Sequence, residues 1–168
     1  MPRLQESLLV AAPIKKVHAV LADIERAGEW LPYVEDTRLT SENATGEGAE
    51  IELTVGAAGK KSQGTARCVA ATPSHLVYEA KLALGLTFKV TFDLAAEGRQ
   101  KTRMDATVEY AFTGLTGRLI GKVIGDKAAQ RDIVAGLETL KAHLEAEAAT
   151  PARRRKAASA AAPEATKR

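Results

Sequence analysis

The stretch GLTGRLIGKVIGDKAAQRDIVAGLETLKAHLEAEA, residues 114–148, decides the fold because it predicts one long helix near the C-terminal end. This helix follows a series of short strands and is not interleaved with them, an order that predicts an α+β fold. A curved antiparallel sheet has one apolar face to bury, and a helix laid across that face can close it without filling it. Apolar residues at helical spacing mark the expected buried stripe: Leu115, Leu119, Val123, Leu137, Leu140 and Leu144.

The residues before this helix predict a sheet of about seven strands. The clearest strand alternates the apolar residues Leu86, Phe88, Val90 and Phe92 with polar ones, as a strand with one wet face does. Apolar residues at helical spacing predict a helix over 13–24, and Gly28 and Pro32 bound a second helical turn across 25–31. The expected strands span residues 4–11, 34–42, 48–56, 61–71, 75–84, 86–95 and 102–112.

The composition fits one domain that is sparsely filled. A chain of 168 residues suits one domain with a real core, and 45% of the residues are apolar. Aromatic residues make up only 4%, and Ala, Gly and Thr occupy many positions that would otherwise carry bulk. A curved sheet lined this way is hard to pack to normal interior density, which favours a cavity. Aliphatic side chains alone could also close the core, and composition does not choose between the two.

A basic tail follows the expected domain of residues 1–148. Residues 150–168 carry six basic residues and one acidic residue, which is a net charge of +5. Because the whole chain carries +3, the rest of it carries about −2. The Ala- and Pro-rich segment 149–168 cannot bury enough apolar surface and is predicted to be disordered. The cluster Arg153–Lys156 could touch membrane head groups weakly, or act only as a solubilising tail. It has no interleaved aromatic residue, which argues against binding to nucleic acid.

Cysteine and hydropathy patterns point to a cytoplasmic protein with at most peripheral membrane contact. Cys68 is the single cysteine, so no internal disulfide can form. The first residues lack the apolar stretch of a secretion signal, and no apolar run is long enough to span a bilayer.

The sequence offers no strong signal for catalysis, a metal or a cofactor. His18, His75 and His143 lie on separate expected elements without ligand spacing, so no metal site is predicted. No nucleophile elbow occurs, and Cys68 is expected to be a small core or edge residue. The glycine-rich stretch 56–61 joins two expected strands, which indicates a hairpin turn and not a phosphate loop. No cofactor is expected.

The candidate site residues surround the expected space between sheet and helix. Trp30 and Tyr33 stand where the helical pair leads into the sheet, and Thr65 and Arg67 are two apart on one strand, so they share a face. If that face is the inner one, a guanidinium and a hydroxyl would orient a ligand; if it is the outer one, Arg67 is a surface arginine. The expected ligand-binding residues are Trp30, Tyr33, Val55, Thr65, Arg67, Phe88, Val90, Tyr110, Leu119 and Leu137.

Three glycines at every fourth position complicate the C-terminal helix. Gly117, Gly121 and Gly125 lower helix stability, so they indicate either close backbone packing or a mobile hinge. Such a hinge could let the first part of the helix act as a lid over a chamber.

Two segments resemble the START-related superfamily of helix-grip proteins, the polyketide cyclase/dehydrase and lipid transport group. They are ESLLVAAPIKKVHAVLADIERAGEWLP, residues 6–32, and the end of the C-terminal helix with its L-x-x-L-K pattern. The resemblance covers about residues 3–147. It implies a sheet wrapped around a long helix with two short helices after the first strand, and it is far more specific for this fold than for an activity.

The resemblance implies two functions, and the tail suggests a third. The first is a carrier or accessory protein that binds a lipid-, quinone- or polyketide-like molecule between sheet and helix. The second is an aromatase/cyclase that uses Arg67 with Tyr33 or Thr65, because such enzymes have a Trp, an Arg and a hydroxyl at similar places. The third is an interaction protein that works through its basic tail.

Overall fold

The computed structural model describes residues 3–30, 34–57, 60–83 and 85–149, and the statements below concern these residues. Seven strands and four helices follow the predicted order, with one short 3-10 helix (η1) between the first two helices. The elements are β1 (Arg3–Val10), α1 (Ile14–Ala22), η1 (Ile24–Arg26), α2 (Ala27–Trp30), β2 (Val34–Leu39), β3 (Glu50–Ala57), β4 (Lys60–Thr72), β5 (His75–Leu82), β6 (Leu86–Ala96), β7 (Thr102–Phe112), α3 (Gly114–Ile124) and α4 (Asp126–Ala149).

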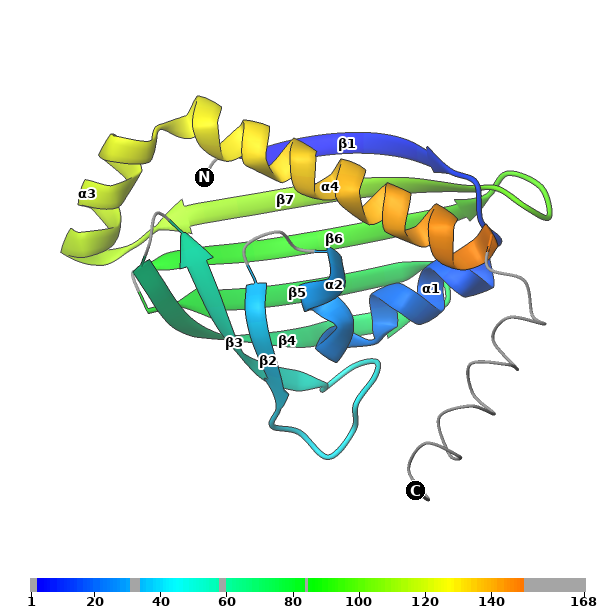
Figure 1. Cartoon of the computed structure of the whole chain (residues 1–168), viewed down its shortest axis with the longest axis horizontal. Helices are drawn as coiled ribbons and strands as arrows, with labels where there is room; N and C mark the ends of the chain where they lie inside the picture. Colours follow the sequence, from blue (N-terminus) through cyan, green and yellow to red (C-terminus); the bar gives the residue numbers. More distant parts are fainter. Residues whose placement is uncertain (1–2, 31–33, 58–59, 84, 150–168) are drawn as a thin grey trace, which may run out of the picture.

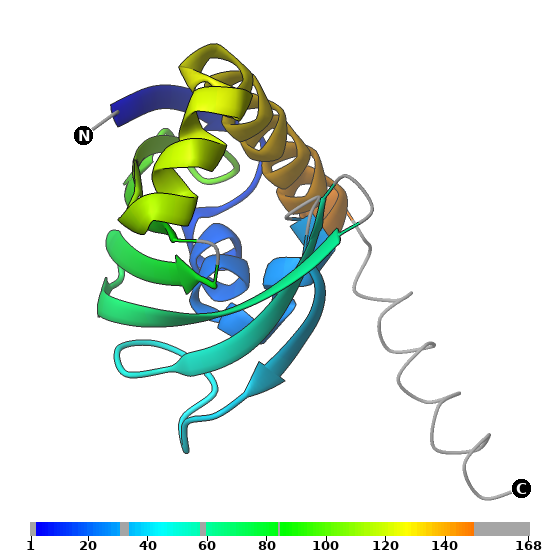
Figure 2. The ribbon, with the colours of Figure 1, turned by 90° about the vertical axis from the view of Figure 1, so that its left-hand side faces the viewer.

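One antiparallel sheet holds all seven strands in the order β1-β7-β6-β5-β4-β3-β2. From β2 to β7 each strand pairs with the next one along the chain, and β1 pairs with β7. Helices α1, α2 and α4 lie across one face of this sheet (Figure 1). Seen end-on, the sheet curves around that face (Figure 2). The predicted α+β fold, a curved sheet around a long C-terminal helix, is confirmed.

The strand register decides which side chains face the helices. In β7, the even-numbered residues from Thr102 to Tyr110 are buried and the odd-numbered ones are more exposed. Phe92 of β6 pairs with Leu76 of β5 and with Ala106 of β7, and all three are buried. The even-numbered side chains of β5, β6 and β7 therefore form the inner face of the sheet, because side chains alternate along a strand.

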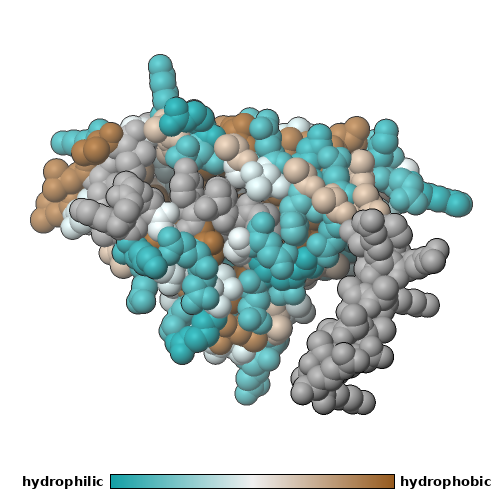
Figure 3. Space-filling view, in the orientation of Figure 1, coloured by the Kyte–Doolittle hydropathy of each residue, from teal (hydrophilic) through white to brown (hydrophobic). Residues whose placement is uncertain are grey.

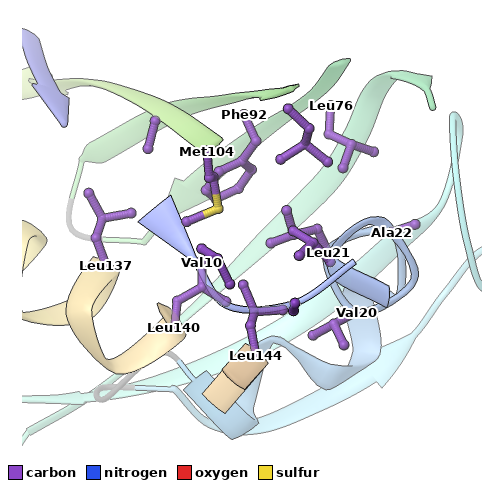
Figure 4. Packing of buried hydrophobic residues seen from close by; sticks show 14 residues of the cluster. Val10, Val20, Leu21, Ala22, Leu76, Phe92, Met104, Leu137, Leu140 and Leu144 are labelled. Atoms are coloured by element: carbon purple, nitrogen blue, oxygen red, sulfur yellow. The ribbon is translucent and has the colours of Figure 1, made fainter. Parts of the chain in front are cut away.

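The main core lies where α1 and the second half of α4 meet the sheet. Leu137, Leu140 and Leu144 of α4 point toward the inner face, where Phe92 and Met104 meet them (Figure 4). The other labelled members of this cluster are Val10, Val20, Leu21, Ala22 and Leu76. A smaller cluster joins Ile24, Ala49, Ile51, Leu53 and Cys68. Cys68 is buried, as expected of a small core residue.

The prediction of one uninterrupted helix over 114–148 is wrong, because the chain breaks at Gly125 between α3 and α4. Gly125 has a φ of +74°, which ends α3, and its N–H donates to the carbonyl oxygen of Gly121 over 3.0 Å. The predicted buried stripe is correct only in α4. In α3, Leu115, Leu119 and Val123 are 84%, 65% and 86% exposed.

Among the described residues, no helix combines the length and hydropathy needed to cross a membrane. The predicted disordered tail, 149–168, lies outside the described residues except for Ala149, which ends α4.

Candidate ligand-binding site

The inner face of the sheet is unevenly covered, and its two ends differ. At the end below α1 and the second half of α4, the inward side chains are fully buried. We call this the closed end; it comprises Leu76, Phe92, Met104, Ala106, Leu140 and Leu144. At the other end, next to α3, the inward apolar side chains are only partly buried. We call this the open end; it comprises Val55, Ala66, Ala80, Leu82, Leu86, Phe88 and Phe112.

The partial burial at the open end lies in the middle of the sheet and not at its margin. Ala80 of β5 pairs with Phe88 of β6 on one side and with Ala66 of β4 on the other. Central inward positions are normally the best buried part of a sheet. Their residual exposure therefore indicates that the described residues do not fill the space in front of them.

Aromatic rings gather at the open end. The ring centroids of Phe88 and Tyr110 are 6.5 Å apart, and those of Tyr110 and Phe112 are 6.2 Å apart in an edge-on arrangement. Tyr110 is buried, whereas Phe88 and Phe112 are partly exposed. The partly exposed rings of Phe88 and Phe112 give the open end aromatic surface of the kind that lines sites for apolar molecules.

Helix α3 packs beside the open end through glycines. A Cβ atom on Gly117 would lie 3.0 Å from the carbonyl oxygen of Gly85, and one on Gly121 would lie 2.8 Å from the ring of Phe112. A Cβ atom would crowd the backbone of Gly85 at the first position and would force the ring of Phe112 to shift at the second, so the expectation of close packing is confirmed. The same glycines add no bulk to the space in front of the sheet. The alternative, a hinge at Gly125, stays a prediction.

Two predicted site residues face the wrong side of the sheet. Thr65 and Arg67 are exposed on the outer face, where Arg67 is 59% exposed and approaches Glu79 at 3.9 Å. The sequence allowed either face, and the outer one is observed because the even-numbered residues of β4, which include the buried Cys68, face the core. Thr65 instead borders a hollow of about 460 Å3 on the outer face, together with Asp36, Arg38, Glu52, Leu53, Thr54, Gln63 and Gly64.

The other predicted site residues divide into four groups. Val55, Phe88, Val90 and Tyr110 lie on the inner face at or beside the open end, and Leu137 is buried in the main core. Leu119 was also misplaced, because its side chain points into solvent from α3. Trp30 is the last residue of α2, but its side chain and the whole of Tyr33 lie outside the described residues.

Ser62 is an inner-face residue that the sequence reasoning did not select. It pairs with Val55 across β3 and β4, and its Oγ is buried without a hydrogen-bond partner among the described residues. A buried hydroxyl without a partner is costly unless something else supplies one. The sequence could have indicated this position, because Ser62 is an even number of residues from Cys68 and side chains that far apart on a strand share one face.

The remaining polar groups of the inner face are already engaged. The Tyr78 hydroxyl donates to the backbone carbonyl of Leu21, and the Cys68 thiol donates to the carbonyl oxygen of Ala70 over 3.3 Å. Burial raises the pKa of both groups above their ordinary values. Both groups are therefore neutral near pH 7, and their hydrogen bonds hold them within the core.

An ion-pair cluster, which we call the clamp, ties α2 and η1 to α4. Arg26 donates to Glu147 at 2.7 Å and to Glu29 at 3.0 Å, and these two carboxylates hold its pKa above the usual range. The Nε2 atom of His143 lies 3.2 Å from a Glu29 oxygen and 3.6 Å from a Glu147 oxygen. Three potential metal donors thus stand together, but Arg26 already occupies both carboxylates.

The comparisons with known proteins agree with the fold. The family model described as polyketide cyclase / dehydrase and lipid transport matches residues 1–145. No curated protein matches the chain.

Solved structures share the fold at low sequence identity. The Zhui aromatase/cyclase from Streptomyces sp. R1128 is 19% identical with a TM-score of 0.69, and the match covers 86% of this chain and 93% of that one. A START superfamily protein from Mycobacterium smegmatis is 12% identical with a TM-score of 0.66, covering 87% and 96%. The major latex-like protein 151 of Panax ginseng is 9% identical with a TM-score of 0.62, covering 84% and 96%.

Proposed function

The chain belongs to the polyketide cyclase / dehydrase and lipid transport family, and we propose that it binds one small apolar molecule at the open end, as a carrier or accessory protein. The observation that carries this proposal is the partial burial of inward apolar side chains in the centre of the sheet. Ala80 and Phe88 keep accessible surface in positions where a filled core would leave none. An apolar guest would remove that surface from water.

The expected affinity comes from the buried apolar area. Each Å2 of apolar surface removed from water contributes roughly 25 cal/mol, from which the cost of ordering the guest is subtracted. The described open end offers aromatic and aliphatic contacts, and its one buried hydroxyl without a described partner is that of Ser62. This lining favours a lipid-like or quinone-like molecule over a sugar or a nucleotide.

No reaction is proposed. The cyclase hypothesis required Arg67, with Tyr33 or Thr65, to polarise a carbonyl group inside the chamber. Arg67 and Thr65 lie on the outer face, so the sheet itself separates them from the inner face. A general acid or base must reach the proton that it transfers, and these two residues do not.

Native mass spectrometry of the purified protein tests the proposal. We expect an additional mass that organic extraction removes, and uptake of the apolar fluorescent probe N-phenyl-1-naphthylamine by the extracted protein. Protein that carries no apolar compound and takes up no probe would overturn the proposed function.

A matched pair of variants locates the probe. Phe88→Asp places a carboxylate on the inner face at the open end, and we expect it to abolish uptake because a charge is costly in apolar surroundings. Lys89→Asp places the same group one residue away, on the exposed outer face, and should leave uptake unchanged. Thermal unfolding of both variants confirms that each is folded.

A further inference from the structure

Helix α3 carries an exposed apolar ridge that packs against nothing in the described structure. Leu115, Leu119 and Val123 follow at every fourth position, so they form one stripe along the helix. A hydrophobic patch is visible over α3 at the left end of the molecule (Figure 3). Scattered surface leucines need no explanation, but a continuous apolar stripe marks an interaction site.

The ridge faces outward because the opposite side of α3, which carries Gly117 and Gly121, packs closely against the sheet. With about 100° of rotation per residue, Gly117 and Gly121 lie on the side of the helix opposite Leu119. The glycine side contacts Gly85 and Phe112 so closely that a Cβ atom at either glycine would crowd its neighbour. The orientation of α3 is therefore fixed by steric fit, and the apolar residues are left on the surface.

The charged residues beside the ridge indicate what kind of surface it binds. Arg118 and Lys122 flank the ridge and are exposed, and α3 contains no acidic residue. Lys127, at the start of α4, adds a third exposed positive charge. Two copies of the chain that paired through this ridge would bring these like charges together, which is unfavourable. An anionic lipid surface supplies both an apolar layer and negative head groups.

We propose that α3 docks on an anionic lipid bilayer, with the ridge in the interfacial layer and Arg118 and Lys122 at the phosphates. This inference rests on the proposed function, because α3 borders the open end through Gly121 and Phe112. Docking would bring the open end to the membrane, where an apolar guest is taken up or released. The occupant is the lipid surface itself, and the contact involves α3 and not the basic tail.

Vesicle co-sedimentation of the full-length protein tests this docking. We expect binding to vesicles of phosphatidylcholine and phosphatidylglycerol, and much weaker binding to phosphatidylcholine alone. The double variant Leu119→Ser/Val123→Ser should bind anionic vesicles at least about tenfold more weakly, because it removes most of the apolar contact. The variant Leu9→Ser changes a half-exposed leucine on β1 and serves as the control that should bind normally.

A second double variant, at the two basic residues beside the ridge, sharpens the test. Arg118→Ala/Lys122→Ala should lose most of the preference for anionic vesicles, and the remaining binding should depend little on salt.

Three results would overturn the docking proposal. One is vesicle binding that the ridge variant leaves unchanged, since the contact would then lie elsewhere, for example in residues 150–168. Another is absence of vesicle binding in the unmodified protein. The third is an unmodified dimer that the ridge variant converts to monomer without any change in vesicle binding, which would identify a second copy as the partner.

Uptake of N-phenyl-1-naphthylamine separates this inference from the proposed function. The ridge variants should take up the probe normally, because the ridge lies outside the open end. Normal uptake without vesicle binding would refute the docking alone, and vesicle binding without uptake would refute the proposed carrier.

Discussion

The closed and open ends of the sheet share strands β5, β6 and β7 but receive different residues from the C-terminal helices. At the closed end, α4 supplies Leu137, Leu140 and Leu144, and the inward side chains there are buried. Beside the open end, α3 supplies Gly117 and Gly121 and turns its leucines outward. An incompletely filled core can therefore arise where the covering helix presents glycines in place of leucines, although the same sheet continues beneath both helices.

The largest expected effect comes from removing equal side chains at the two ends. Leu140→Ala should lower the free energy of unfolding by about 2–5 kcal/mol, because it leaves a cavity in a tightly packed core. Leu82→Ala, on the partly exposed inner face of β5, should cost only about 1 kcal/mol, since less surface is buried there. Urea unfolding measures both, and equal losses would contradict the difference between the two ends.

The glycine side of α3 can be broken by one bulky residue. Gly121→Leu should displace α3 from Phe112 and lower the free energy of unfolding by about 1–3 kcal/mol, because the new side chain clashes with the ring. Leu is a good helix former, so the loss comes from the clash and not from helix propensity. Amide hydrogen exchange should accelerate over 114–124 while 126–149 stays protected. Thr116→Ala, an exposed change in the same helix, is the control. Unchanged exchange in the Gly121 variant would show that α3 does not depend on this contact.

The clamp between α2 and α4 holds the closed end together from outside the core. Arg26→Ala should lower the free energy of unfolding by about 1 kcal/mol, and the loss should shrink at high salt. Arg38→Ala removes a more exposed guanidinium, paired with Glu52, and should have almost no effect. Urea unfolding at low and high salt separates the two variants, and equal losses would show that the clamp adds nothing beyond a surface ion pair.

The smallest expected effect is a loss of stability in alkali. The folded state holds the pKa of Cys68 and Tyr78 above their ordinary values of 9.0 and 10.0. Below these values both states keep the protons, so the contribution is complete. As pH rises above them, the unfolded chain loses its protons first, and the free energy of unfolding falls.

Urea unfolding at several alkaline pH values measures that fall. The double variant Cys68→Ala/Tyr78→Phe should show a shallower decline than the unmodified protein. An identical decline would mean that burial of these two groups does not contribute.

The fold was predictable because its signals are periodic. Alternation in β6 and β7 and helical spacing in α1 and α4 each match the structure closely. The orientation of α3 was not predictable in the same way. Its leucines and its glycines both recur every four residues, so either stripe could face the sheet. The rule that apolar residues are buried predicted that the leucines would face the sheet. In the structure the glycines face it, because they allow a close approach to Gly85 and Phe112.

The candidate site was harder to predict than the fold because strand parity was weak in β4. Small residues such as Gly64 and Ala66 alternate there with the polar residues Gln63, Thr65 and Arg67, so neither face looks strongly apolar. A register shift between Cys68 and Ala70 disturbs the pattern further. The prediction therefore selected Thr65 and Arg67 for their polar side chains, whereas the inner face of β4 carries Ser62 and Ala66.

One substitution pair tests the unfilled open end most directly. Ala80 and Ala106 both lie on the inner face, but Ala80 is at the partly exposed open end and Ala106 is buried at the closed end. Ala106→Leu should lower the free energy of unfolding by about 1–3 kcal/mol, because it overpacks a filled core. Ala80→Leu should leave stability unchanged or raise it while it reduces uptake of N-phenyl-1-naphthylamine. A loss at Ala80 as large as that at Ala106 would mean that the interior is solid and has no room for a guest.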